Sequence, residues 1–337
     1  MSPEVGPIRP PSEAGSLLVR VSRNCPWNRC AFCPVFKEKT FSRRSVREVL
    51  CDLDDWRERY GDGITTVFLQ DANPLLTRAD DLVTILEAIR ERFPRVHRIT
   101  AYARSNTLAK RSLEDLARIR RAGLDRLHVG LESGCDAVLE TVSKGTTRAE
   151  QIEAGRKAKE TGFELSEYVM PGLGGRRLTD AHARDTASAV RAIGPDFVRI
   201  RTTAVVPGTG LAELAESGAF DPLSEVESVE EIRRFLTALD GCRTRIESDH
   251  DMNLLLELRG RLPEDLEALI ALIDRFLNLD EAEQDAFVFG RRTGLLTHLD
   301  RMKGETVSRR IRESMADLRA RGVDPLAAAA ILRMQRL

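Results

Sequence analysis

The segment Cys25-Pro-Trp-Asn-Arg-Cys30-Ala-Phe-Cys33 places three cysteines within nine positions, directly after a short apolar run at Ser16–Ser22. Thiolates are the preferred protein ligands of iron–sulfur clusters and of zinc. A structural zinc site usually has four protein ligands, and no fourth cysteine or histidine follows at finger-like spacing. Three thiolates that leave one position open therefore favour a [4Fe–4S] cluster, with zinc and unrelated buried thiols as the alternatives.

Outward from this loop, short apolar and β-branched runs alternate with stretches of helical period. The runs predict strands at Ser16–Ser22, Ile64–Gln70, His97–Tyr102, Arg126–Leu131, Glu164–Met170 and Phe197–Val206. The stretches between them predict helices at Ser45–Tyr60, Arg78–Phe93, Ser112–Ala122, Arg148–Thr161 and Asp180–Ile193. Such strand–helix units indicate a parallel α/β sheet, because parallel neighbours need a crossover connection. Periodicity alone leaves open whether the sheet closes, but a barrel-like sheet would gather its functional loops at the carboxyl ends of its strands.

The two ends of the chain differ from this alternation. Residues 1–14 contain four prolines and no apolar periodicity, so we expect a flexible segment over residues 1–15. Residues 16–245 would form the barrel, and residues 246–337 a helical C-terminal region. The helices expected there are Leu254–Leu258, Asp265–Leu277, Ala282–Phe289, Thr306–Arg319 and Pro325–Arg336.

Composition excludes several classes of protein. The 337 residues carry 52 Lys and Arg against 53 Asp and Glu, and this balance argues against a dominant nucleic-acid or anionic-membrane surface. Six cysteines are too few for a disulfide framework in a chain of this length. No apolar run approaches the length that spans a bilayer, and the N-terminal residues do not read as a signal peptide, so we expect a cytoplasmic protein.

The cysteine loop resembles that of the radical S-adenosylmethionine (SAM) enzymes. Their usual motif is Cys-x3-Cys-x2-Cys after the first strand of a partial (β/α)6 barrel, with an aromatic residue before the third cysteine. Cys30-Ala-Phe-Cys33 matches the second half of that motif, whereas one extra residue separates Cys25 from Cys30. The resemblance implies an α/β fold with a partial, TIM-like barrel, followed here by the helical C-terminal region.

Further motifs follow in the order of one branch of that superfamily. The segments Val129–Leu139 and Ser143–Thr147 resemble the fourth-strand signature of oxygen-independent coproporphyrinogen oxidase, the methylthiotransferases and the Elongator-type enzymes. Val169–Gly175 and Val206–Leu211 resemble the fifth and sixth loops of that branch. Together with the cysteine loop, these motifs extend the resemblance over about residues 16–212.

The resemblance implies the residues of the cofactor site, with Cys25, Cys30 and Cys33 as cluster ligands. Asp71, Ala72 and Asn73 stand where the family has a Gly-Gly-Glu-like loop, and the two glycines are missing. The implied SAM contacts are Phe32 and the backbone of Ala204 and Val205 for the adenine, Ala72 and Asn73 for the methionyl amine, Arg104 or Ser105 at the third strand end, Glu132 for the ribose and methionyl group, Lys144 for the carboxylate, and Glu167 for the ribose hydroxyls.

These side chains also have ordinary structural explanations. Glu132 could cap the following helix, and Lys144 and Arg104 could be solvated surface charges. The glycines within residues 172–175 could serve only a tight turn. Cys135 could be a reactive thiol, and His250, between two aspartates, could contact substrate or be an exposed cap.

The resemblance implies an enzyme that cleaves SAM reductively through a [4Fe–4S] cluster. A 5′-deoxyadenosyl radical would then abstract hydrogen from an unknown substrate, with an electron donor of the flavodoxin or ferredoxin type. The alternative is a non-catalytic protein of the same ancestry that binds cluster and SAM and carries haem or another cofactor.

Overall fold

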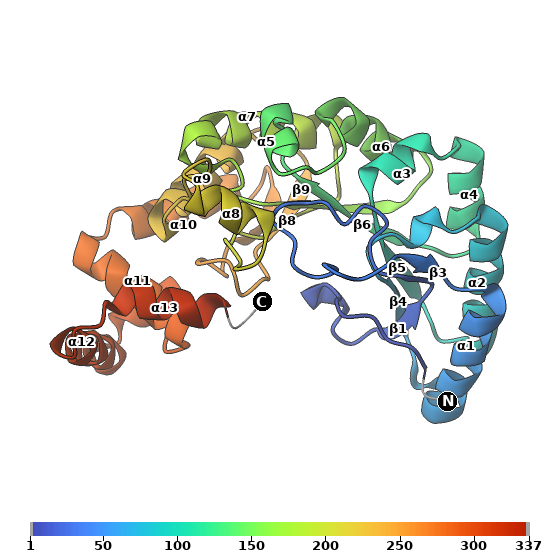
Figure 1. Cartoon of the computed structure of the whole chain (residues 1–337), viewed down its shortest axis with the longest axis horizontal. Coiled ribbons are helices and arrows are strands. Elements are labelled where there is room, and N and C mark those ends of the chain that lie inside the picture. The colour runs from blue at the N-terminus through green and yellow to red at the C-terminus, as the bar shows by residue number, and fades with distance from the viewer. Residues whose placement is uncertain (1–2, 335–337) are drawn as a thin grey trace. The chain divides into compact units, whose positions relative to one another are not determined.

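The computed structural model describes residues 3–334 and shows the alternation of strands and helices expected from the sequence (Figure 1). An eight-stranded sheet has the strand order β1-β4-β5-β6-β7-β8-β9-β10. Its first four strands pair in parallel, whereas the last two are antiparallel. The strands are β1 (Leu17–Arg20), β4 (Thr66–Gln70), β5 (Arg98–Ala103), β6 (Arg126–Glu132), β7 (Glu164–Val169), β8 (Phe197–Ile200), β9 (Thr244–Glu247) and β10 (Arg259–Leu262). The predicted α/β class is thus confirmed.

The helices follow the strands in the expected order. They are α1 (Val46–Tyr60), α2 (Ala79–Arg92), α3 (Ser105–Lys110), α4 (Leu113–Arg121), α5 (Asp136–Thr141), α6 (Arg148–Glu160), α7 (Gly175–Ile193), α8 (Gly210–Glu216), α9 (Glu225–Thr237), α10 (Leu266–Leu277), α11 (Glu281–Thr293), α12 (Glu305–Ala320) and α13 (Pro325–Met334). No helix within residues 3–334 combines the length and the hydrophobicity needed to cross a lipid bilayer.

Residue contacts divide the chain into two compact units. The first unit contains residues up to 168 together with 189–198, and the second unit contains residues 169–188 together with those from 199 onward. In the first unit, α1, α2 and α4 lie along the outer side of β1, β4 and β5 (Figure 1). Val67, Phe68 and Leu69 of β4 are fully buried, because a parallel strand covered by helices is shielded on both faces.

The N-terminal segment, expected to be flexible, is bound to the first unit in its described part. Gly6 donates its N–H to Gln70 at the end of β4 (2.7 Å). Glu13 is fully buried, accepts a hydrogen bond from Ser16 (2.6 Å) and lies 3.3 Å from the ring nitrogen of His128 on β6. These attachments are polar, so a search for apolar periodicity could not reveal them.

Two predicted elements after α7 are wrong. The strand expected over Phe197–Val206 ends at Ile200, where the Asn253 side chain binds the backbone on both sides of Arg201. The segment Leu254–Leu258 is irregular and lies in the connection between β9 and β10, an antiparallel pair that the sequence analysis missed. Four leucines among five residues do not distinguish helix from extended chain, and tertiary burial decides the conformation here.

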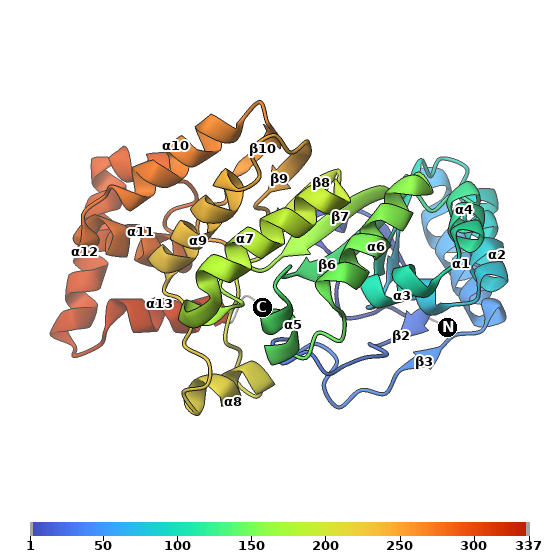
Figure 2. The same cartoon turned by 90° about the horizontal axis from the view of Figure 1, so that it is seen from above.

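The other helices expected in the C-terminal region are present. The segments Asp265–Leu277, Ala282–Phe289 and Thr306–Arg319 correspond to α10, α11 and α12. Pro325–Arg336 corresponds to α13, and its last two residues lie outside the described range. Figure 2 shows α9 and α10 side by side, and these two helices contact each other. The proposed boundaries at residues 16 and 246 stay predictions.

We expect Asn253→Ala to destabilise the protein by about 2–4 kcal/mol, because several buried polar groups lose their partner. Asn253 is 1% exposed; it accepts hydrogen bonds from the N–H and hydroxyl of Thr202 and donates to the Ile200 carbonyl and the Ser248 hydroxyl. Urea unfolding measures the change, with the exposed Asn278→Ala as the control. Equal stability of the two variants would contradict this account of the loop.

Candidate functional site

The three clustered cysteines lie on a partly exposed loop between the short strands β2 (Ser22–Arg23) and β3 (Ser42–Arg43). Asn28 has a left-handed backbone (φ 48°) and donates its N–H to the sulfur of Cys25 (3.3 Å). Cys33 donates its N–H to the carbonyl of Cys30 (3.3 Å). Within residues 3–334, no three His, Cys, Asp or Glu side chains are grouped closely enough to hold a metal ion. The three thiols therefore lie on one loop, but their sulfur atoms are not close enough together to bind one metal ion.

Trp27 attaches this loop to the turn after α5, a role that the sequence analysis missed. Its indole N–H donates to the carbonyl of Ser143 (2.8 Å), and Ala31 donates its N–H to the carbonyl of Val142 (2.8 Å). A Cβ at Gly145 would lie 2.3 Å from the indole ring, so only glycine leaves room for this contact. The signal in the sequence was an aromatic residue inside the cysteine loop together with a glycine inside the Ser143–Thr147 motif.

A buried ion pair lies beside the cysteine loop. The ammonium of Lys144 is 3.0 Å from a carboxylate oxygen of Glu132, and both side chains are largely buried. Arg104 donates to the backbone carbonyl of Lys144 (3.0 Å), and its guanidinium lies 5.3 Å from the Trp27 ring centroid. The Lys144 ammonium also lies 5.8 Å from the ring centroid of Phe32. Lys144 and Arg104 are therefore not simply solvated surface charges, and Glu132 pairs with a cation before α5 begins.

The backbone around Glu132 is shaped for this pair. Glu132 has a positive φ of 61°, which is uncommon for a residue with a side chain and is often found at functional sites. A Cβ at Gly130 would lie 2.2 Å from the Glu132 carboxylate and 2.9 Å from the Lys144 ammonium. The absence of a side chain at position 130 thus makes room for both charged groups.

The ionisable groups around the pair affect one another. Burial raises the pKa of the Cys30 thiol, while Lys144 and Arg104 oppose that rise. Burial alone would lower the pKa of Lys144, but Glu132 and Cys30 raise it above its ordinary value, so this side chain is cationic. Burial, and then the nearby charge of Glu132, raise the pKa of Glu167 well above its usual range.

Glu167 also has an unsatisfied oxygen. The residue is 1% exposed, and its Oε2 atom has no hydrogen-bond partner among residues 3–334. Buried polar atoms are nearly always hydrogen-bonded, so such an atom beside an ion pair indicates a place for a ligand that can donate a hydrogen bond.

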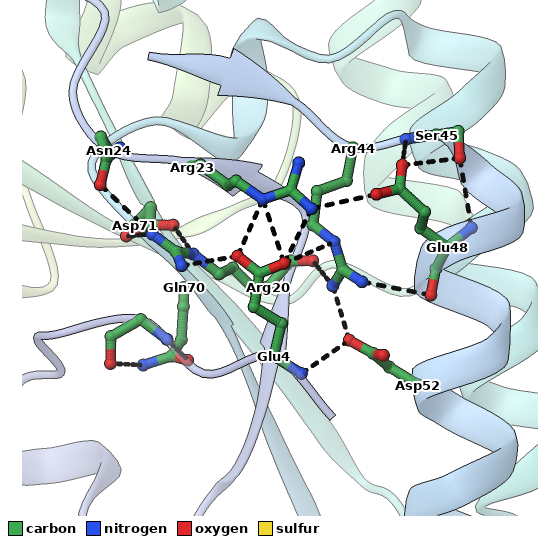
Figure 3. Close-up of polar contacts among 11 residues, drawn as sticks. Glu4, Arg20, Arg23, Asn24, Arg44, Ser45, Glu48, Asp52, Gln70 and Asp71 are labelled. Atoms are coloured by element: carbon green, nitrogen blue, oxygen red, sulfur yellow. Dashed lines mark hydrogen bonds and ion pairs between the residues drawn. The ribbon is translucent and has the colours of Figure 1, made fainter. Parts of the chain in front are cut away.

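The residues after β4 have other partners. Asp71 is fully buried and paired with Arg20, and its φ of 67° turns the chain at the strand end (Figure 3). The Asn73 amide donates to the hydroxyl of Thr107 (2.7 Å). Ala72, between them, is half-buried. Asp71 thus pairs with Arg20, whereas Asn73 contacts α3 and also accepts a hydrogen bond from the N–H of Arg104 (3.4 Å), the residue that binds the Lys144 carbonyl.

Arginines on both sides of the cysteine loop bind the N-terminal segment (Figure 3). The carboxylate of Glu4 accepts hydrogen bonds from Arg20 (2.7 Å) and Arg23 (2.8 Å) and lies 3.5 Å from Arg44. The hydrogen bond from Arg23, together with the charges of the three arginines, holds the pKa of Glu4 below its usual range against burial. These ion pairs fix the chain where it enters and leaves the loop.

The other predicted positions take no part in the contacts described above. Ser105 is buried at the start of α3, and Cys135 is the buried N-cap residue of α5. Ala204 and Val205 are half-buried in the irregular segment after β8, in the second unit. The glycines at the β7–α7 turn include positive φ values (85° at position 172 and 58° at position 175), so a turn role accounts for them.

We expect Glu167→Gln to stabilise the cofactor-free protein at pH 8 and to have little effect near pH 4.5. The raised pKa means that the folded state resists losing this proton, so wild-type stability falls as pH rises above the ordinary carboxyl value of 4.5. Glutamine has no proton to lose, and this cost disappears. Urea unfolding at both pH values measures the difference, with the exposed Glu140→Gln as the control. A variant less stable than wild type at pH 8 would contradict the assignment.

Comparison with known proteins agrees with the branch that the motifs indicated. The family model of the Radical SAM superfamily matches residues 19–190. Elongator complex protein 3 of Mus musculus is 31% identical over 143 residues, which cover 41% of this chain and 25% of that protein. The 4′-phospho-dehydrooxetanocin synthase of Priestia megaterium is 30% identical over 183 residues, which cover 47% of this chain and 24% of that protein. The chain thus matches about a quarter of the length of these relatives.

Among solved structures, coproporphyrinogen III oxidase (HemN) from Escherichia coli, described as a radical SAM enzyme, has a TM-score of 0.50. It is 18% identical, and the similarity covers 66% of this chain and 52% of that one, so it bears on the fold alone. The family match extends from β1 through the cysteine loop and β7 into α7, over half of the chain. On that match the chain belongs to the radical SAM superfamily of enzymes, whose cofactors are a [4Fe–4S] cluster and S-adenosylmethionine.

Proposed function

We propose that Cys25, Cys30 and Cys33 hold the [4Fe–4S] cluster and leave one iron open for SAM. The donor set fits this group, because three thiols on one short loop match the ligands that such clusters prefer. Cys30 also lies within the electrostatic influence of Lys144 and Arg104, which favour the thiolate that a metal needs. Cluster binding requires the loop to bring the three sulfur atoms together.

SAM binding is proposed for the surroundings of the Glu132–Lys144 pair. Lys144 would bind the SAM carboxylate, Glu132 the ribose and methionyl group, and the unsatisfied oxygen of Glu167 a ribose hydroxyl. The remaining contacts proposed in the first unit are Phe32 for the adenine, Ala72 and Asn73 for the amine, and Arg104 or Ser105 at the end of β5. Ala204 and Val205 belong to the second unit, and their contact with the adenine stays a prediction.

The proposed reaction is reductive cleavage of SAM followed by hydrogen abstraction from a substrate. When bound, the cluster and SAM supply an electron and a 5′-deoxyadenosyl radical, which is chemistry that no side chain provides. The chain supplies charge and position: Lys144 stays cationic through Glu132, and Arg104 holds the Lys144 backbone beside Trp27. A reductant is required, and we propose a donor of the flavodoxin or ferredoxin type in the cytoplasm.

One observation supports this function most strongly. The buried Glu132–Lys144 pair influences two further groups electrostatically: the Glu167 carboxyl group, whose Oε2 atom has no hydrogen-bond partner among residues 3–334, and the Cys30 thiol. A cation, a carboxylate, a buried carboxyl group and a thiol thereby share one electrostatic environment in the first unit. A zwitterionic ligand with hydroxyl groups fits that set of charges and acceptors.

We expect the anaerobically reconstituted protein to contain about four irons per chain and, with dithionite, to release 5′-deoxyadenosine from SAM. The triple variant Cys25→Ala, Cys30→Ala, Cys33→Ala should lose the iron chromophore and the product, because it lacks the clustered thiolates. Iron analysis and chromatography of the nucleoside measure both effects. Cys51→Ala and Cys242→Ala are the controls and should retain both.

Zinc without iron after anaerobic reconstitution would overturn the cluster assignment. Tight haem binding without release of 5′-deoxyadenosine would instead support the carrier alternative.

A further inference from the structure

A second cluster of charges lies within the second unit, where the chain after β8 meets residues 249–253 and helices α9, α11 and α13. Each of its acids has an arginine partner. The pairs are Arg199 with Asp249, Arg291 with Asp251 (3.8 Å), and Glu225 with both Arg292 (2.7 Å) and Arg333 (3.2 Å). Burial would raise the pKa of Glu225, but Arg333 and Arg292 hold it below its usual range, so this carboxylate is charged.

Arg201 adds a positive charge without an acidic partner. Its backbone N–H donates to the carbonyl of Val169 (2.9 Å), which places it directly beyond the end of β8. Its side chain is half-buried and makes no hydrogen bond or ion pair with any residue of the described range 3–334. A half-buried guanidinium group without a hydrogen-bond or ion-pair partner usually either faces solvent or belongs to a site that binds an anion.

Arg333 is held beside the same segment and also retains a free donor. Its Nη2 donates to the carbonyls of Thr203 (3.2 Å) and Met252 (3.1 Å), so α13 is tied to the residues after β8. Its Nε atom is buried and has no hydrogen-bond partner in the part of the chain that the structure describes. Because Glu225 is shared with Arg292, this pair of arginines is only partly neutralised.

His250 supplies a neutral donor at the same place. Met252 donates its N–H to the Nδ1 atom of His250 (3.2 Å), and this bond leaves the ring proton on Nε2. Burial, and then the charge of Arg201, lower the pKa of His250 to about 4, so the ring is neutral at pH 7. The effects of Arg201 and Arg333 on this ring show that the three side chains share one electrostatic environment.

We propose that Arg201, His250 and Arg333 bind an anionic group of the substrate, a carboxylate or a phosphate. The Arg201 side chain and the Nε atom of Arg333 have no partner among the described residues, so they offer positive charge and free donors to an anion. A guanidinium binds a carboxylate or phosphate through two parallel hydrogen bonds, and the His250 Nε2–H adds a third donor. The carboxyl ends of strands in such sheets are where ligands bind.

This inference rests on the proposed function, because it takes the anion to be part of the substrate. It is nevertheless tested without reduction or SAM cleavage. Loss of 5′-deoxyadenosine formation would count against the proposed function alone, whereas loss of anion binding would count against this inference alone.

The test is NMR of the full-length, cluster-reconstituted protein carrying ¹³Cε1-labelled histidine, titrated with inorganic phosphate and separately with acetate. Chloride keeps the ionic strength constant, because long-range charge effects are screened by salt. We expect a saturable shift of the His250 signal, whereas the other four of the five histidines should not titrate with the anion. The anion with the lower dissociation constant identifies the chemical group.

Arg201→Gln should weaken this binding roughly tenfold or more, the loss of a charge-assisted contact. Arg201→Lys, which keeps the charge but not the paired donors, should have an intermediate effect. Arg309→Gln removes the same charge from a side chain that is 68% exposed and should match wild type. An absent or unsaturable shift, or equal affinity in wild type and Arg201→Gln, would overturn the proposal. Competition by SAM would assign the site to the cofactor and also overturn it.

Discussion

The buried contact between Lys144 and Glu132 determines the arrangement of the first unit's site. Removing two charges from water costs free energy, so a buried ion pair needs close contact between its charged groups and neighbours that leave space for both side chains. Position 130 lacks a side chain that would clash, and the positive φ of Glu132 turns its carboxylate toward the lysine. Arg104 fixes the lysine backbone, and Trp27 packs on the following glycine. The cysteine loop is therefore held by the same turn that presents the cation.

Much of this arrangement could be predicted from sequence. The strand–helix alternation predicted α1, α2, α4 and α6 to within a few residues, whereas α9, which follows the last predicted strand, was missed. The motifs singled out Glu132, Lys144 and Arg104, which the fold brings into contact with one another and with Phe32 and Trp27 of the cysteine loop; their roles toward SAM stay predictions. Trp27 escaped notice because a contact across 116 positions leaves no local pattern. The burial of Glu13 against His128 was hidden for the same reason, since its partners are polar and distant in sequence.

The balanced net charge of −1 conceals two clusters of different character. Around Glu4, three arginines meet acids that neutralise them, and the result is a structural anchor for the chain near the cysteine loop. Around Glu225, the arginines exceed the acids, and a neutral histidine adds a donor. Amino-acid composition cannot distinguish the cluster around Glu4 from the cluster around Glu225, because only the folded chain shows which charges are paired. The unpaired set is where a ligand gains most from binding.

The most direct measurement of this account is the affinity of the anaerobic, cluster-loaded protein for SAM in the Glu132→Gln variant. Glutamine keeps the shape of the side chain but removes the charge that pairs with Lys144 and would hold SAM. The account predicts a loss of about 1–3 kcal/mol, roughly fivefold to 150-fold in dissociation constant, with the cluster retained. The exposed Glu140→Gln, eight positions further on, should bind as wild type does. Unchanged SAM affinity in Glu132→Gln, with only lower thermal stability, would show that the pair is structural and would contradict the account.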